Sequence, residues 1–132
     1  MTLQQLQQEI GAWSEMTFDD ETPLPKLHHL RQEVAELIAA PYDKTEYADC
    51  LILLIDAARK AGISAEELIR AADEKMEINR RRTWSEPDQN GVVHHLPSMF
   101  EPAQPELFSF SPENYAPAYS PGYELNAPEF TK

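Results

Sequence analysis

Apolar residues recur at helical spacing along the first part of the chain. One such segment covers residues 2–16 and begins with Thr2 and Gln5, the pattern of a capping box. Its apolar positions are Leu3, Leu6, Ile10 and Trp13. Another starts near Pro25, a residue that suits the first turn of a helix, and ends at Pro41. Spacings of three and four residues predict a helix in each segment.

Two more helices are predicted further along the chain. The segment 44–61 is apolar nearly all round, which is typical of a central and well-buried helix. The segment 64–82 opens with Ser64 as N-cap and Glu67 at the third helical position. No segment alternates with period two for long enough to form a strand. The pattern therefore predicts an all-α domain, a four-helix bundle, over residues 1–96.

The composition changes after Leu96. Residues 97–132 contain most of the 11 prolines and most of the phenylalanines and tyrosines. Proline excludes long helices and central strands, whereas disordered segments are usually poor in aromatic residues. We therefore expect an extended, acidic tail that docks on the bundle or on a neighbouring subunit. A flexible tail without function is the alternative.

The charge narrows the range of partners. The 132 residues include 11 Lys+Arg and 23 Asp+Glu, a formal net charge of −12. Such acidity argues against a nucleic-acid partner and against an anionic membrane surface, and no apolar stretch is long enough to span a membrane. The single cysteine, Cys50, excludes an internal disulfide and suits the reducing cytoplasm.

Four carboxylates occupy positions where helices should pack. Glu33 and Glu36 lie beside the apolar arc of the second helix, while Glu46 and Asp49 lie on the largely apolar third helix. The short turn 41–43 makes these helices antiparallel, so the two pairs would project toward each other. Clustered carboxylates repel unless a cation neutralises them, and oxygen ligands select Mg²⁺, Mn²⁺ or Ca²⁺. A solvated acidic face is the alternative.

The two carboxylate pairs belong to a longer set of motifs. These are Glu33-x-x-Glu36, the string Glu46-Tyr47-Ala48-Asp49-Cys50-Leu51-Ile52-Leu53-Leu54, Lys75-x-x-x-Asn79-Arg80-Arg81-Arg82-x-Trp84, and Pro87-Asp88-x-Asn90-Gly91-Val92-Val93. With them the chain resembles the MazG-type all-α nucleoside triphosphate pyrophosphohydrolases. Within that superfamily it is most similar to the phage and prophage dATP/dGTP diphosphohydrolases.

The resemblance implies cleavage of a nucleoside triphosphate between its α and β phosphates, giving a monophosphate and pyrophosphate. It implies Mg²⁺, for which Mn²⁺ can substitute, held by Glu33, Glu36, Glu46 and Asp49. An activated water would attack, with Glu33 or Glu36 as general base; the sequence does not choose between them.

A basic cluster on the fourth helix would serve the phosphates. Lys75, Asn79 and Arg82 follow at spacings of four and three, on one helical face. We assign Lys75 and Arg82 to phosphate contacts and Asn79 to the sugar or a phosphate. The alternative is that these are exposed cations at a helix end, favoured by the helix dipole.

Other candidates have weaker signals. Trp13, with Phe18, could stack on a base and is kept as a substrate-binding candidate, although Trp13 also fits the apolar stripe of its helix and a core role is favoured. Asp56 is expected to make a polar contact rather than to bind metal. His28 and His29 diverge by about 100° on a helix, which indicates roles at the surface or at the edge of the substrate site.

The apolar faces of the third helix exceed what one small bundle can cover, so we expect a homodimer or homotetramer, as in related enzymes. Two rival functions stay open. One is a related enzyme that prefers a pyrimidine such as dUTP or dCTP. The other is a non-catalytic acidic interaction module, which would tolerate neutral substitutions of the carboxylates.

Overall fold

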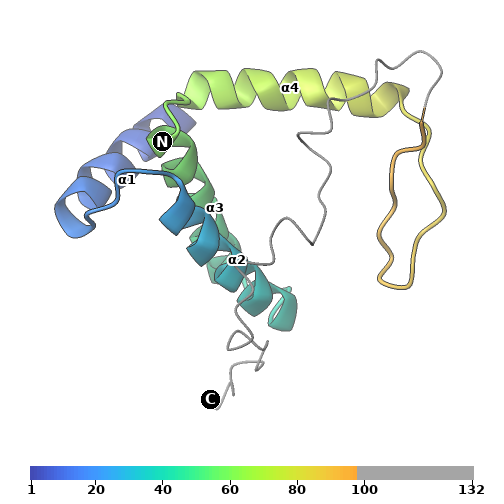
Figure 1. Cartoon of the computed structure of the whole chain (residues 1–132), viewed down its shortest axis with the longest axis horizontal. Coiled ribbons are helices and arrows are strands. Elements are labelled where there is room, and N and C mark those ends of the chain that lie inside the picture. Colours follow the sequence, from blue (N-terminus) through green and yellow to red (C-terminus); the bar gives the residue numbers. More distant parts are fainter. Residues whose placement is uncertain (98–132) are drawn as a thin grey trace. The chain divides into compact units, whose positions relative to one another are not determined.

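The computed structural model describes residues 1–97, and the prediction of a docked tail lies outside the described residues. Four helices follow one another along the chain (Figure 1). They are α1 (Leu3–Thr17), α2 (Leu24–Ala39), α3 (Lys44–Lys60) and α4 (Ala65–Arg81). Within residues 1–97 the only β-type pairing is an isolated bridge between Trp84 and His95. The predicted all-α class and its four helices are confirmed.

Both predicted capping boxes are present. The Gln5 amide donates to Thr2 Oγ1 over 3.1 Å, and the Thr2 amide donates to Gln5 Oε1 over 2.7 Å. At the start of α4, the Glu67 amide donates to Ser64 Oγ over 3.2 Å and the Ser64 amide to Glu67 Oε2 over 2.8 Å. These side chains pair backbone donors that the first helical turn leaves without partners.

Helix α3 is central, because α1 and α2 both pack against it (Figure 1). Its second half is buried, and Ile55 and Ala57 are 1% and 3% exposed. Its first half is more open, since Tyr47, Leu51 and Leu54 each expose about half of their surface. The apolar pattern around α3 therefore exceeds what α1 and α2 cover.

Helix α4 is anchored at its first turn. The Gln7 side chain of α1 donates to the Ile63 carbonyl over 3.1 Å and accepts from the Ala65 amide over 2.8 Å. Beyond this point, within the described part of the chain, α4 packs along none of the other three helices. Its apolar side chains Ile69 and Met76 are consequently about half exposed.

The chain divides into two compact units, Met1–Arg80 and a second that begins at Arg81. In the second unit, Gly91 adopts a φ of 77° and its amide donates to the Asp88 carbonyl. Backbone amides of Val92 and Asn90 donate to the Asp88 carboxylate and hold its pKa below the usual value. The tight turn predicted at Asn90-Gly91 is confirmed. No helix within residues 1–97 combines the length and apolarity that crossing a membrane requires.

Candidate metal centre and pocket

Three of the four predicted carboxylates converge between α2 and α3. Glu33 comes from α2, while Glu46 and Asp49 come from α3. Each offers one oxygen, and these oxygens lie within 4.8 Å of one another. Glu33 and Glu46 are half-buried and Asp49 is exposed. The convergence follows from the packing of α2 along α3, which their short connection allows.

Glu46 is the carboxylate of this cluster that has an unpartnered oxygen among the described residues. Its Oε2 atom is buried and has no hydrogen-bond partner among the described residues. Burial raises the pKa of the Glu46 carboxyl, and nearby negative charges raise it further; they belong to Glu36, Asp43, Asp49 and Glu33. An unpaired, buried carboxylate oxygen is costly, and a hard divalent cation would satisfy it. The residues present therefore fit such an ion.

The other predicted ligand, Glu36, stands beside the cluster rather than in it. Its charge is near enough to raise the pKa of Glu46, but its oxygens are not among those that converge. His29 Nε2 lies 2.8 Å from Glu33 Oε1 and so orients that carboxylate. His29 thus lies at the edge of the site, one of the two roles indicated by the sequence.

A pocket of about 420 Å³ opens next to the carboxylates, with lining residues from α1, α2 and α3. Glu33 and Asp49 of the cluster line it, and so do Lys26 and Asp56. Its apolar wall includes Ile10, Trp13, Phe18, Ile52 and Leu53. The rings of Trp13 and Phe18 meet edge to face, with centroids 5.2 Å apart.

The core role favoured for Trp13 is wrong. Its side chain is 51% exposed and lines the pocket instead of filling the interior. The apolar periodicity of α1 could not show this, because a pocket wall and a core use the same residue types at the same spacing.

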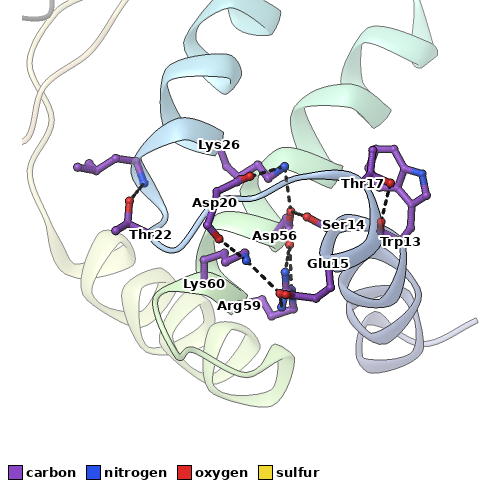
Figure 2. A network of polar contacts seen from close by, with 11 residues as sticks. Trp13, Ser14, Glu15, Thr17, Asp20, Thr22, Lys26, Asp56, Arg59 and Lys60 are labelled. Carbon is purple, nitrogen blue, oxygen red and sulfur yellow. Dashed lines mark hydrogen bonds and ion pairs between the residues drawn. The ribbon is translucent and has the colours of Figure 1, made fainter.

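Asp56 is the centre of a buried polar network (Figure 2). It is 2% exposed; its Oδ2 accepts from Ser14 Oγ over 2.6 Å and its Oδ1 accepts from Arg59 Nε over 2.9 Å. The Lys26 ammonium lies 3.5 Å from Asp56 Oδ2 and 3.2 Å from Asp20 Oδ2. It also lies 3.5 Å from the centroid of the Phe18 ring, a cation–π contact. The prediction that Asp56 makes polar contacts is confirmed.

The same network ties α1 to α3. Arg59 and Lys60 both bind Glu15 Oε1, over 2.8 and 3.0 Å (Figure 2). Hydrogen bonds from Lys60 and Arg59 hold the pKa of Glu15 below its usual value. A Cβ at Gly11 would lie only 2.9 Å from Arg59 Cδ, so a glycine lets α1 approach this side chain.

Sequence reasoning missed Lys26, which is 5% exposed and lines the pocket. A usable signal was present. Lys26 precedes Glu33 by seven residues on α2, and Asp56 follows Asp49 by seven on α3, so each pair shares a helix face. A lysine usually occupies the surface, and only the buried carboxylates of Asp56 and Asp20 make its burial tolerable.

The substrate-binding cluster predicted on α4 does not lie at the pocket of its own chain. Lys75 and Asn79 are on α4 and are not among the residues that line the pocket of the same chain. Arg82 belongs to the unit that begins at Arg81. Their contacts to substrate remain a prediction.

A four-helix chain with a carboxylate cluster beside a pocket is the architecture of the MazG-like pyrophosphohydrolases, and comparison with known proteins agrees. The model of the dATP/dGTP pyrophosphohydrolase family matches residues 6–101. The chain belongs to this family, and the resemblance found in its sequence is confirmed.

Two phage proteins named dATP/dGTP diphosphohydrolase are similar to it. The protein of cyanophage S-2L is 40% identical over 106 residues, which cover 79% of this chain and 97% of that protein. The protein of Salmonella phage PMBT28 is 42% identical over 96 residues, which cover 72% of this chain but only 32% of that protein.

A solved structure is also similar. It is the cyanophage S-2L MazG-like pyrophosphohydrolase bound to dGDP and three catalytic Mn²⁺ ions per active site. It matches with a TM-score of 0.61 and 40% identity, over 74% of this chain and 99% of that one.

Proposed function

We propose that this protein hydrolyses dATP and dGTP to the nucleoside monophosphate and pyrophosphate, using Mg²⁺, for which Mn²⁺ can substitute. The observation that carries this proposal is the buried, unpartnered Oε2 of Glu46, held against Glu33 and Asp49 beside a pocket. The single cysteine suits the cytoplasm as the place of action.

The acidic site is compatible with a triphosphate only through a cation. Carboxylates repel phosphate oxygens, so the site needs a metal ion between the two. Glu33, Glu46 and Asp49 would hold this metal, and Glu36 stands beside them. A divalent cation bound there would neutralise phosphate charge and make a water molecule more acidic. The water oxygen bonds to the α phosphorus, and the bond to the oxygen bridging to the β phosphorus breaks.

Of the two candidate bases, we favour Glu36. Glu33 converges with the other carboxylates and pairs with His29, so its oxygens are already engaged. Glu36 lies close to Glu46 without joining the converging set. A carboxylate in that position can accept the proton of the attacking water.

The pocket would take the nucleoside part of the substrate. Its volume of about 420 Å³ lies in the usual range for small-molecule sites. The exposed ring of Trp13, with Phe18 behind it, offers an aromatic surface on which a base can stack.

A panel of all common dNTPs and NTPs with Mg²⁺, read out by product separation, tests the proposal. We expect dATP and dGTP to give monophosphate plus pyrophosphate, pyrimidines to react far more slowly, and EDTA to stop turnover. Diphosphate plus orthophosphate would refute the reaction type. Equal rates on all four dNTPs would remove the purine preference and leave the chemistry standing.

We further propose that the protein is a homodimer or homotetramer in which α4 serves a neighbouring copy. On α4, Lys75 and Asn79 share one face with Leu68, Ala72 and Met76. This face packs along no other helix of its own unit, so a second copy would cover it. Lys75 and Asn79 would then reach the phosphates of the neighbour, and Arg82 follows them at the end of α4.

Complementation separates shared sites from self-contained ones. Asp49→Asn and Lys75→Ala should each be inactive alone. The two variants are then mixed and allowed to re-assemble at random. If one copy supplies the carboxylates and another supplies α4, each mixed dimer has one intact site of two, so activity returns to about a quarter of that of the unmodified protein. Mixtures that stay inactive would show that each chain builds its own site.

A further inference from the structure

We propose that Lys26 is the residue that recognises the purine ring of the substrate, through a hydrogen bond from its ammonium group to N7. The inference rests on the proposed function and deepens it by naming a specificity-determining residue. Lys26 is 5% exposed and lines the pocket, and its ammonium lies over the Phe18 ring.

The pocket has two polar ends that match the two ends of a nucleotide. Lys26 and Glu33 are seven residues apart on α2, and Asp49 and Asp56 are seven apart on α3. Two helical turns correspond to about 10 Å along each helix. With the phosphates at the carboxylate cluster, the base lies toward Lys26, between the apolar walls that include Trp13, Ile52 and Leu53.

The ammonium group of Lys26 limits which atoms of the base it can bind. An ammonium only donates, so it must meet an acceptor. Adenine and guanine share the acceptors N7 and N3, whereas the pattern at position 6 differs between them. N3 lies next to the sugar, so N7 is the shared acceptor on the edge that points away from it. Pyrimidines have no N7, which gives a preference for both purines with one side chain.

The groups around Lys26 leave one N–H of its ammonium for a hydrogen bond to N7. Its ammonium faces two carboxylates, Asp20 at 3.2 Å and Asp56 at 3.5 Å, and its remaining side is against the Phe18 ring. The Asp56 oxygen that Lys26 faces also accepts from Ser14 Oγ at 2.6 Å, and the other Asp56 oxygen accepts from Arg59 Nε at 2.9 Å. A ring nitrogen is a stronger acceptor than an aromatic face, so N7 can take over the third N–H.

Lys60 provides the matched control. Its side chain is 10% exposed, it binds Glu15 over 3.0 Å within the same network, and it is not among the pocket-lining residues. Lys60→Met therefore removes a poorly exposed ammonium from the network without removing one from the pocket.

The experiment compares dATP and dGTP with 7-deaza-dATP and 7-deaza-dGTP, in which C–H replaces N7. Unmodified protein, Lys26→Met and Lys60→Met are assayed with Mg²⁺, and kcat/KM is measured for each substrate and for dCTP. We expect the 7-deaza analogues to lose about tenfold or more with unmodified protein and with Lys60→Met. With Lys26→Met the natural purines should fall to the level of the analogues, and the preference over dCTP should narrow.

The outcomes are separable. Equal kcat/KM for natural and 7-deaza purines with unmodified protein would overturn the assignment of Lys26 and leave the hydrolase intact. So would a 7-deaza penalty that persists in Lys26→Met. No turnover of natural purines by unmodified protein would refute the hydrolase, and the assignment with it. If Lys26→Met does not fold, Lys26→Met/Asp56→Asn removes the buried ammonium together with the charge of one of its two carboxylate partners, and it carries the same comparison.

Discussion

At the scale of single residues, two buried carboxylates differ in whether they have hydrogen-bond partners, and this difference gives them different roles. Glu46 has a buried oxygen without a hydrogen bond and a raised pKa, whereas both oxygens of Asp56 accept hydrogen bonds. The first fits a cation ligand, and the second is structural. Both are acidic residues on the same helix, so residue type alone could not separate them.

Glu46→Gln should separate metal binding from folding. The substitution removes one charge from a repelling cluster, so the melting temperature of the metal-free protein should stay or rise. The increase in melting temperature on adding Mg²⁺ should shrink, because that increase follows from metal bound to the folded state. We expect kcat/KM to fall by about a hundredfold or more.

Glu66→Gln, on the exposed surface of α4, is the control and should keep both the Mg²⁺ response and the activity. Turnover by Glu46→Gln at a rate close to that of the unmodified protein would remove Glu46 from the metal site.

Asp56→Ala should be strongly destabilising. It leaves Lys26 buried with Asp20 as its remaining carboxylate partner and removes the acceptor of Ser14 and Arg59. We expect the free energy of unfolding in urea to fall by roughly 3–5 kcal/mol. Ser14→Ala, which removes one hydrogen bond, should cost only about 1–3 kcal/mol. Equal losses for the two variants would contradict the central place of Asp56.

At the scale of elements, the helices are joined by charged contacts as well as by apolar packing. Glu15 near the end of α1 binds Arg59 and Lys60 at the end of α3, and Gly11 allows α1 to approach Arg59. The four helices and the capping boxes of α1 and α4 could be read from local sequence, because capping boxes and apolar spacing act within a few residues. The pairing of Glu15 with side chains more than 40 residues away could not.

The contribution of Glu15 should depend on pH with a definite sign. Its pKa is lowered in the folded state, so its stabilisation is present above the usual value of 4.5 and is lost as the pH falls through the lowered pKa. We expect Glu15→Gln to melt about 1–3 °C below the unmodified protein at pH 7. This difference should be constant down to about pH 4.5 and then shrink toward zero.

Thermal melts between pH 7 and pH 3.5 measure this difference. Glu21→Gln, an exposed glutamate in the loop before α2, is the control and should show no such pH-dependent difference. A gap that widens at low pH for Glu15→Gln would contradict the pairing.

At the scale of the whole molecule, the exposed apolar residues point to self-association. Ile69 and Met76 on α4, and Tyr47 and Leu51 on α3, each expose about half of their surface. Covering such residues with a second copy removes apolar surface from water. In an assembly with closed symmetry, the same apolar surface is covered on both copies at once.

A charge on this face of α4 should break the assembly. Ile69→Glu places a carboxylate where a neighbouring copy would pack, and light scattering should report a smaller mass. Arg70→Glu places a carboxylate on the opposite side of α4, roughly 160° from Ala72 at the centre of the proposed face, and should leave the mass unchanged. The same mass for both variants and the unmodified protein would place the interface elsewhere or show a monomer.

The sequence by itself determined the four helices, the capping boxes of the first and fourth, and the carboxylate pairs on the second and third, because each depends on spacing within a few turns. The motifs also identified the family. Only the tertiary structure decided that Glu33 joins Glu46 and Asp49 while Glu36 stands beside them. It also decided that Trp13 lines a pocket and that Lys26 is buried against Asp56. These facts depend on how three helices face one another, and side-chain periodicity along a single helix carries no information about that.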